Sequence, residues 1–417
     1  MGALESCVKF ESLISESPSS VKLLSHNLRG LIRLFSSTMK QLDTMKKLLS
    51  NQPLFAKEGG LREAISGRTI MVTGAGGSIG SELCRQVLPH KPRQLILLGH
   101  GEHSIFTLHS ELSRLDSTAS LVPVIASVQN EIRMEHTFRR FAPDVVFHAA
   151  AHKHVPLMEL NIEEAVLNNV LGTCNVVSAA TESGAGVLLL ISTDKASNPV
   201  SVLGATKRVA ELVLSEAAAD TGSCFVSVRF GNVIDSRGGV VSVFNDQISR
   251  GGPVTVTHPD MERYFMTTHD AVELVLQAIR LGKGGEIFVL DVGQPLRIVD
   301  VAENLIRSRG LTPGVDIEIV FTGARPGERL TEELFRHGHY QKTTLPNVLI
   351  LGNGHHETGN HKANPLQDNV RQLIDAAQRH DRNEVRTLLA TIVPEYNQSA
   401  QLNSEELLPQ ARSSAAS

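Results

Sequence analysis

Short apolar segments alternate with amphipathic ones from Arg68 onward, and this alternation most constrains the fold. A buried parallel strand is apolar throughout, and the crossover helix that follows it is apolar on one side. The pattern therefore predicts an α/β fold with a doubly wound parallel sheet, covered by helices on both faces, and a smaller C-terminal lobe. The expected strands are Thr69–Thr73, Gln94–Leu98, Val122–Ala126, Asp144–Ala149, Val187–Ile191, Phe225–Arg229 and Ile287–Leu290.

The same pattern divides the chain into three parts. We expect a helical or partly disordered extension at 1–66, a nucleotide-binding domain at 67–345 and a helical C-terminal extension with a frayed tail at 346–417. Within the domain, the alternation loosens in the loops of 230–265 and 291–345, which we expect to form the smaller lobe. The expected helices are Ser78–Leu88, Ser104–Leu115, Glu131–Arg140, Asn161–Glu182, Ser201–Ala219, Val240–Arg250, His269–Leu281, 296–309, Leu366–Arg379 and Arg382–Thr391.

Composition excludes several classes of protein. With 417 residues, 41% of them apolar and 20% charged, the chain is long enough for a globular core. The net charge of −4, without a basic run, argues against nucleic acid as a partner. The sequence has no apolar run of the roughly 18 residues that a membrane span needs, and no signal peptide. Its four scattered cysteines favour a reduced, cytoplasmic location.

A glycine-rich run, Thr-Gly-Ala-Gly-Gly-Ser-Ile-Gly at 73–80, lies between the first expected strand and the first expected helix. Glycines allow a tight turn and a close approach of the backbone to a pyrophosphate, which the helix N-terminus attracts. Such a run alone is a weak signal, but this position predicts a Rossmann-type dinucleotide site. Its expected residues are Gly74, Gly77, Ser78, Ile79 and Gly80.

The choice between NAD and NADP stays open. An acid about 20 residues after the glycines usually binds the ribose, and Glu102 follows the second strand slightly late. It is either a ribose ligand or a solvated loop charge, and no arginine is placed there for a 2′-phosphate. Ala149 and Ala150 follow the fourth strand, where small residues let the backbone run beside the cofactor.

An acid and an amine follow the fifth strand, at the edge where ligands bind in such sheets. Thr193, Asp194 and Lys195 are consecutive, and Lys207 lies twelve residues past Lys195. Burial can shift both pKa values toward neutrality, so that Asp194 and Lys195 divide general acid and general base catalysis. The alternative is an ordinary exposed Asp-Lys loop. Leu203 lies four residues before Lys207, where a short-chain dehydrogenase carries its tyrosine.

Basic residues in later loops suit an anionic substrate. His152 and Lys153 follow the fourth strand, and we expect them to contact substrate rather than a metal or only solvent. Separated arginines in glycine-rich loops suit a diphosphate, because guanidinium forks match phosphate oxygens. A single such arginine is more often a surface ion pair. The expected substrate residues in these loops are Asn232, Arg237, Arg263, Arg325 and Glu328.

Six strings of the sequence together resemble those of a known family. They are Val-Thr-Gly-Ala-Gly-Gly-Ser-Ile-Gly-Ser-Glu-Leu at 72–83, His-Ala-Ala-Ala-His-Lys-His-Val-Pro-Leu-Met-Glu at 148–159, Ile-Ser-Thr-Asp-Lys-Ala at 191–196, Gly-Ala-Thr-Lys-Arg at 204–208, Arg-Tyr-Phe-Met-Thr at 263–267 and Arg-Pro-Gly-Glu at 325–328. With them, residues 67 to about 340 resemble the catalytic domain of bacterial UDP-N-acetylglucosamine 4,6-dehydratases, in the polysaccharide-biosynthesis branch of the extended short-chain dehydrogenases.

The resemblance implies an NAD(P)-dependent lyase that converts a UDP-sugar to a 4-keto-6-deoxy sugar, and a homo-oligomer. The hydride leaves sugar C4 for the nicotinamide and returns to C6 after water is lost. Lys195 would take the C5 proton, Asp194 would protonate the departing C6 hydroxyl, Thr193 would bind the C4 oxygen and Lys207 the nicotinamide ribose. The group that accepts the C4 hydroxyl proton is not assigned, because Leu203 cannot accept it.

Two other functions stay open. A UDP-sugar 4-epimerase shares the fold and the cofactor, but it needs a phenol-type base rather than Leu203 and has no use for an elimination pair. A non-catalytic NAD(P)- or nucleotide-sugar-binding relative is favoured by three departures from the family pattern, which are Ser127, Asn130 and Asp235.

Overall fold

The structure is a computed structural model that describes residues 60–115, 118–332, 340–351 and 365–396. Most of the expected N-terminal extension at 1–66 and the whole expected frayed tail therefore lie outside the described residues. Of the extension, the structure describes the short helix α3 (Leu61–Ile65).

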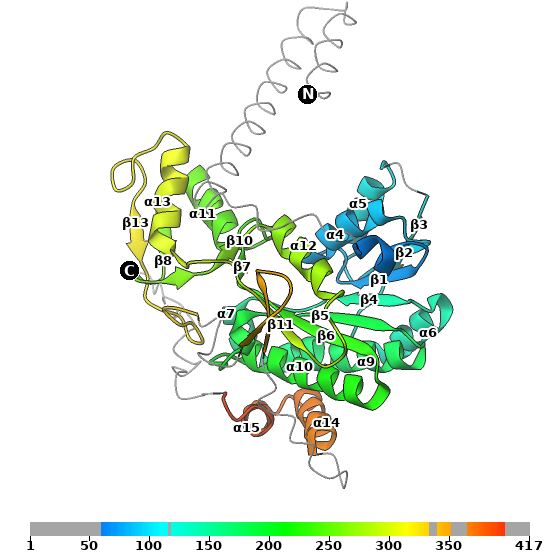
Figure 1. Ribbon diagram of the computed structural model, residues 1–417. Coiled ribbons are helices and arrows are strands. Elements are labelled where there is room, and N and C mark those ends of the chain that lie inside the picture. Colours follow the sequence, from blue (N-terminus) through cyan, green and yellow to red (C-terminus); the bar gives the residue numbers. More distant parts are fainter. Residues whose placement is uncertain (1–59, 116–117, 333–339, 352–364, 397–417) are drawn as a thin grey trace, which may run out of the picture.

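A nine-stranded sheet forms the centre of the molecule, in the order β14-β15-β11-β6-β5-β4-β1-β2-β3 (Figure 1). The seven strands from β11 to β3 in this order are parallel, while β15 and β14 add an antiparallel edge. The predicted fold class is confirmed. The strands are β1 (Thr69–Thr73), β2 (Gln94–Gly99), β3 (Ser120–Ile125), β4 (Val145–His148), β5 (Val187–Ile191), β6 (Cys224–Arg229), β11 (Ile287–Leu290), β14 (Tyr340–Lys342) and β15 (Val348–Leu351).

Helices cover both faces of the sheet, because each crossover between parallel strands must cross one face. One face carries α4 (Ser78–Val87) with η1 (Leu88–His90), α5 (Glu102–Leu112) and α12 (Thr268–Ala278), whose buried side chains join one apolar cluster. The other face carries α6 (Glu131–Phe141), α9 (Gly172–Glu182) and α10 (Val202–Thr221), which pack in a second cluster. The strands from β11 to β2 in this order are therefore buried on both faces, as their apolar residues predict, whereas the edge strand β3 is partly exposed.

The segment expected as one helix at 161–182 is broken by a π-helical turn. It comprises α8 (Ile162–Val166), η2 (Leu167–Leu171) and α9, and is preceded by α7 (Val155–Leu160). The π turn carries Asn169, which is buried and hydrogen-bonds the backbone of His152 and the hydroxyl of Thr206. Periodicity alone does not reveal this irregularity, because its cause is tertiary contact.

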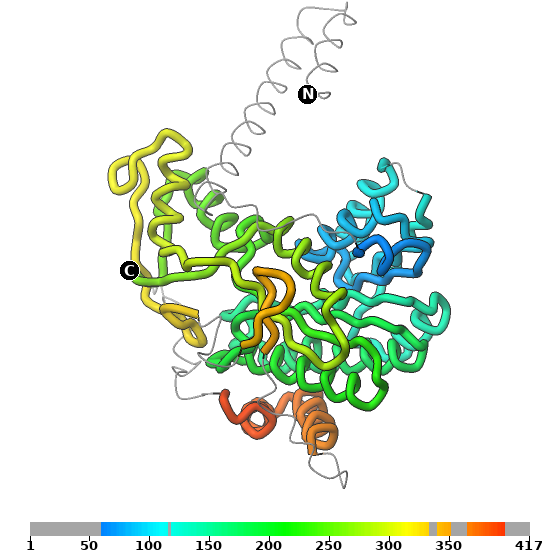
Figure 2. The backbone as a smooth tube through the Cα atoms, viewed as in Figure 1, coloured from blue at the N-terminus to red at the C-terminus, as the bar shows by residue number. Residues whose placement is uncertain are grey.

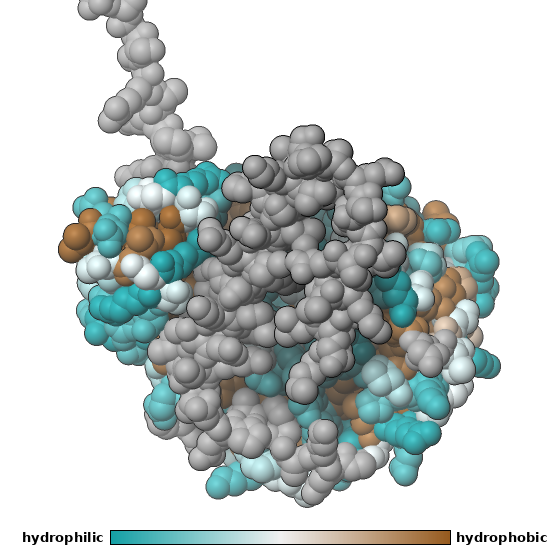
Figure 3. All heavy atoms as spheres, turned by 90° about the horizontal axis from the view of Figure 1, so that it is seen from above, coloured by the Kyte–Doolittle hydropathy of each residue, from teal (hydrophilic) through white to brown (hydrophobic). Residues whose placement is uncertain are grey.

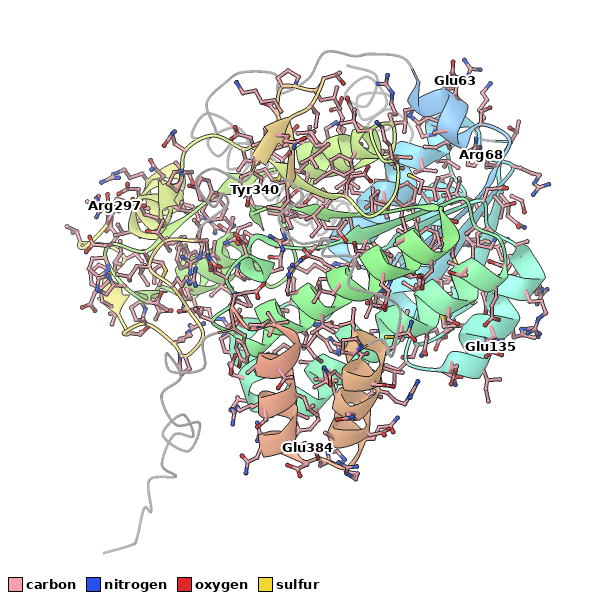
Figure 4. All side chains as sticks on the ribbon, turned by 60° about the horizontal axis from the view of Figure 1, so that its bottom comes forward. Glu63, Arg68, Glu135, Arg297, Tyr340 and Glu384 are labelled. Carbon is pink, nitrogen blue, oxygen red and sulfur yellow. The ribbon has the colours of Figure 1, made fainter. Side chains whose placement is uncertain are left out.

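The smaller lobe stands beside the sheet (Figure 2). Its core is formed by α11 (Val240–Ser249) and α13 (Ile298–Ser308) against short strands. Arg297, directly before α13, lies at the far end of the lobe in Figure 4. The short strands are β7 (Asn232–Val233), β8 (Val254–Val256), β9 (Glu262–Arg263), β10 (Phe265–Met266), β12 (Leu296–Arg297) and β13 (Ile319–Phe321).

Two C-terminal helices, α14 (Pro365–Gln378) and α15 (Arg382–Ile392), pack against α8 and α10. Leu373 and Leu389 are fully buried there, in a third apolar cluster that also contains Leu203. Glu384 of α15 lies on the outer side of this pair (Figure 4). The sheet also continues past the boundary predicted at 345, because β15 pairs with β11.

Figure 3 shows hydrophilic side chains interspersed with smaller apolar groups on the visible described surface. Among the described helices, none combines the length and the apolar character that a membrane span requires.

Candidate active site

The glycine-rich turn joins β1 to the N-terminus of α4. A Cβ on Gly74, whose φ is +67°, would lie 2.6 Å from the backbone nitrogen of Ala150, and a Cβ on Gly80 would lie 2.2 Å from the carbonyl oxygen of Gly74. Neither contact is sterically possible, so both positions require glycine. Gly77 is exposed and caps the helix, which leaves the N–H groups of the first turn, including those of Ser78 and Ile79, directed at the solvent side of the turn.

This turn fits the pyrophosphate of a dinucleotide. The helix has ten residues, an exposed N-terminus without a first-turn acid, and no side chain on its cap. These are the features that favour an anion, through free N–H groups and the helix dipole. The close pairing of Gly74 with Ala150 also brings the loop after β4, with Ala149, alongside the turn.

A buried histidine fixes the end of β4. His148 Nδ1 lies 2.7 Å from Thr73 Oγ1, and its Nε2 lies 3.1 Å from Thr173 Oγ1. Because Thr173 donates its own hydrogen to the Asn169 carbonyl, its oxygen accepts from Nε2–H, and Nδ1 accepts from Thr73. Burial, together with the nearby charge of Lys207, lowers the pKa of His148 to about 3. The ring is therefore neutral and links β1, β4 and α9.

Glu102 and Lys207 are the two residues predicted to bind the riboses of the cofactor. Glu102 is exposed at the first turn of α5, directly after β2. Lys207 is buried in the second turn of α10, and burial lowers its pKa to about 8. The ribose contacts predicted for both residues stay predictions.

The acid–base trio forms a tight turn after β5. Asp194 begins η3 (Asp194–Ala196), and Thr193 caps that turn. Thr193 Oγ1 donates to Asp194 Oδ1 at 2.7 Å, and Lys195 Nζ donates to the same oxygen at 3.0 Å. Asp194 is 2% exposed, and its Oδ2 is buried without a hydrogen-bond partner among the described residues. One carboxylate oxygen is thus held by the protein, while the other is buried without a hydrogen-bond partner among the described residues.

Lys195 lies among acceptors from three segments of the chain. Besides Asp194, its Nζ lies 3.3 Å from Asn232 Oδ1 on β7 and 3.8 Å from Glu332 Oε1. Burial alone would lower the pKa of Lys195, but the charges of Asp194 and Glu332 outweigh it, against a smaller opposing effect of Arg263, and raise the pKa. The side chain is therefore an ammonium at neutral pH.

The start of α10 holds this turn in place. A Cβ on Gly204 would lie 2.2 Å from the Lys195 carbonyl oxygen, so only glycine lets the helix approach so closely. Ser201 Oγ caps the helix at Gly204 N, and the buried Glu159 carboxylate accepts from Val202 N at 2.7 Å. Leu203 is 3% exposed and packs in the apolar cluster with α7 and the C-terminal helices.

Behind the trio lies a buried ion network. Glu211 of α10 is fully buried; its carboxylate accepts from Ser192 Oγ at 2.5 Å and from Arg229 Nη2 at 2.6 Å. Burial would raise the pKa of Glu211, but Arg229 and Arg208 hold it below its usual value. Arg229 also donates to the Ala196 carbonyl at the end of the trio's turn. The network therefore fixes the acid–base turn to β6 and α10.

The structure brings some of the predicted substrate residues to this cluster. Asn232 contacts Lys195 directly, and Arg263 is buried 3.7 Å from Glu332, donating to the carbonyls of Glu262 and Leu330. Gly327, in the Arg-Pro-Gly-Glu segment, packs on Ser201. This segment therefore closes over the start of α10.

Other predicted residues lie at the rim. Arg325 is exposed, and its backbone N–H donates to Glu328 Oε2. Arg237 is exposed, and its backbone N–H donates to Ser78 Oγ, so its loop lies against the glycine-rich turn. His152 Nε2 lies 3.0 Å from Glu164 Oε1. Lys153 is exposed beside it. Their predicted substrate contacts stay predictions.

The three departures from the family pattern have structural partners. Asn130 Oδ1 caps α6 by accepting from Arg133 N, and Ser127 Oγ accepts from Gln129 N. Asp235 Oδ1 accepts from both the backbone N–H and the hydroxyl of Thr268, at the start of α12. Each of these side chains therefore stabilises local structure.

Glu332 is the site residue that sequence reasoning missed. It lies in the run Thr-Glu-Glu-Leu at 331–334, where nothing in the sequence distinguishes an inward carboxylate from a solvated one.

Among the described residues, no group of three His, Cys, Asp or Glu side chains is arranged to hold a metal ion.

Comparison with known protein families shows to which family the chain belongs. The sequence matches the family described as polysaccharide biosynthesis protein over residues 70–352. The chain belongs to this family. It is 53% identical to the capsular polysaccharide biosynthesis protein CapD of Staphylococcus aureus over 292 residues, which are 70% of this chain and 49% of CapD. The chain thus spans about half the length of that relative.

More distant relatives carry two different activities in their names. The chain is 33% identical to a UDP-N-acetylglucosamine 4,6-dehydratase (inverting) of Campylobacter jejuni over 272 residues, 64% of this chain and 77% of the relative. It is 34% identical to a UDP-glucose 4-epimerase of Rickettsia akari over 275 residues, with the same two coverages. The family is therefore one of nucleotide-sugar dehydratases and epimerases in the extended short-chain dehydrogenase group.

Solved structures share the fold. Pen from Bacillus thuringiensis is 32% identical with a TM-score of 0.63, covering 69% of this chain and 90% of Pen. DesIV, a dTDP-glucose 4,6-dehydratase from Streptomyces venezuelae solved with NAD bound, is 21% identical with a TM-score of 0.57, covering 64% of this chain and 88% of DesIV. The second likeness shows the fold alone.

Proposed function

We propose that the protein is a nucleotide-sugar 4,6-dehydratase that acts on UDP-N-acetylglucosamine or a close UDP-sugar and uses NAD or NADP. The supporting observation is the buried Asp194–Lys195 pair, with 3.0 Å between Oδ1 and Nζ and with Asp194 Oδ2 unpartnered among the described residues. A nicotinamide dinucleotide held by its pyrophosphate at the glycine-rich turn would supply reversible hydride transfer.

The pair supplies the two proton transfers that an elimination needs. If the Lys195 ammonium passes its proton to the Asp194 carboxylate, the pair becomes a neutral amine beside a neutral acid. Lys195 then accepts the proton from C5, which a 4-keto group makes acidic, and Asp194 donates its proton to the departing C6 hydroxyl. The reaction consumes one proton at C6 and releases one at C5, so the pair returns to its starting charge.

A UDP-sugar 4-epimerase is the second candidate, supported by the Rickettsia akari relative. Against it, position 203 holds a buried apolar side chain that cannot accept a proton, and the elimination pair has no task in that reaction. A non-catalytic binding protein is the third. The homo-oligomer and the cytoplasmic location stay predictions from the sequence.

One experiment separates the three. Purified protein is incubated with NAD or NADP and UDP-N-acetylglucosamine, and the nucleotide sugar is examined by mass spectrometry for its mass and by proton NMR for its configuration at C4. We expect a product lighter by one water. A product of unchanged mass with inverted C4 identifies an epimerase, and recovery of the substrate alone, with cofactor bound, identifies a binding protein.

A further inference from the structure

Glu332 carries a buried carboxylate that lies between two cations. These are Lys195 of the acid–base turn and Arg263 of the smaller lobe. Glu332 is 7% exposed, and its Oε1 lies 3.8 Å from Lys195 Nζ and 3.7 Å from Arg263 Nη2. Unpaired carboxylates are strongly disfavoured at such burial, so the two cations are what permits a charged Glu332 there.

The backbone fixes this carboxylate in place. The residues just before Glu332 run beside β9: Glu262 N donates to the Leu330 carbonyl at 2.8 Å, and Glu262 forms an isolated bridge with Thr331. Arg329 donates to the Asn198 carbonyl at 2.6 Å, in the loop that follows the acid–base turn. The segment thus joins the lobe to that loop, and Glu332 carries its charge to the junction.

We propose that Glu332 is a positioning residue that holds the Lys195 ammonium against Asp194 and sets the pH at which Lys195 loses its proton to solvent. Its consequence for catalysis rests on the proposed dehydratase function. The charged groups that face Lys195 are Asp194 from η3, Glu332 from the 325–332 segment and Arg263 from β9; Asn232 on β7 adds a neutral acceptor.

Removing the Glu332 charge should lower the pKa of Lys195. Two negative groups and one positive group act on Lys195; without Glu332 one of each remains, and Arg263 loses its carboxylate partner. The ammonium is then less stabilised, and the amine becomes neutral at a lower pH. An opposite charge at about this distance shifts a pKa by roughly 1–3 units, so Glu332→Gln should lower the pH at which Lys195 titrates by about that amount.

The test measures the Lys195 amine without substrate. The full-length protein is acetylated briefly with acetic anhydride across a pH series, and the modified fraction of Lys195 is read by peptide mass spectrometry. We expect the midpoint for Lys195 to fall in Glu332→Gln, and to fall less in Glu332→Asp, which keeps the charge but withdraws it by one methylene. Glu303→Gln, which removes a carboxylate paired with Arg307 on α13, should leave it unchanged.

Outcomes for the inference and for the proposed function are distinct. An unchanged Lys195 midpoint in both Glu332 variants, in folded protein, overturns the inference, whatever the enzyme does with a sugar. If Glu332→Gln does not fold, the Glu332→Asp midpoint decides the question. A shifted midpoint in a protein that never dehydrates a UDP-sugar upholds the inference and rejects the function. In an active enzyme, the basic limb of the pH–rate profile, where the pair loses its one proton, should move to lower pH in Glu332→Gln, and return toward the parent in Glu332→Asp.

Discussion

At the residue scale, the proposed chemistry depends on which oxygen of Asp194 the protein already holds. Thr193 and Lys195 both bind Asp194 Oδ1, whereas Oδ2 has no hydrogen-bond partner among the described residues. The same arrangement leaves Lys195 charged in the free protein. A proton transfer within the pair is therefore required before Lys195 can act as a base.

Lys195→Ala should block the elimination while leaving C4 oxidation possible, because it removes the C5 base alone. Reduced cofactor should accumulate with substrate, and solvent deuterium should not enter C5; the loss of dehydration should be about 10²–10⁴-fold. Asp194→Asn should instead slow the loss of water, since a neutral amide cannot deliver a proton. Lys283→Ala, at an exposed loop lysine, is the control and should match the parent. If Lys195→Ala dehydrates the sugar as fast as the parent, the base lies elsewhere.

At the scale of elements, the glycine-rich turn and α4 form a phosphate site through backbone geometry. Gly77→Asp should abolish binding of NAD and NADP, because it places a carboxylate at the helix N-terminus where the pyrophosphate is expected. Gly186→Asp adds the same side chain directly before β5, at the N-terminal ends of the parallel strands, whereas the glycine-rich turn lies at their C-terminal ends. An added Cβ at Gly186 meets only the Asp144 carbonyl oxygen, at 3.9 Å. This variant should bind cofactor like the parent. Isothermal titration calorimetry measures both, and normal binding by Gly77→Asp would show that the site is misplaced.

Helices and strands could be predicted from the sequence where a local apolar pattern determines them. They could not be predicted where tertiary contacts determine them. The apolar runs of β1, β5 and β11 match the expected bounds, because a strand buried on both faces must be apolar along its length. Strand β14, Tyr-Gln-Lys, lies at the edge and has no such pattern, so it was not predicted. Its partner β15, Val-Leu-Ile-Leu, is apolar but only four residues long, and it was not predicted either. The site divides in the same way: Asp194 and Lys195 are readable as neighbours, whereas Glu332 reaches them only through folding of a segment more than a hundred residues away.

At the scale of the whole molecule, the C-terminal helices are part of the catalytic unit's core. The cluster that buries Leu373 and Leu389 also buries Val202 and Leu203, at the start of the helix that Gly204 presses against Lys195. Arg208 extends the ion network behind the trio to Glu395, directly after α15. Apolar packing and buried charge therefore both connect the C-terminal helices to the acid–base turn.

This connection predicts a single cooperative unfolding unit. Leu389→Ala should lower the free energy of unfolding by about 2–5 kcal/mol, through lost burial and the cavity left behind, while Leu389→Met, close in volume, should cost less than about 1.5 kcal/mol. Arg371→Ala, at an exposed position of α14, should change it by no more than about 0.5 kcal/mol. Hydrogen exchange gives the decisive comparison: amides of α14, α15 and α10 should open with the same free energy, and Leu389→Ala should lower all three together. Faster opening confined to α14 and α15 would show that the helices detach by themselves and that the acid–base turn is held by α10 and β6 alone.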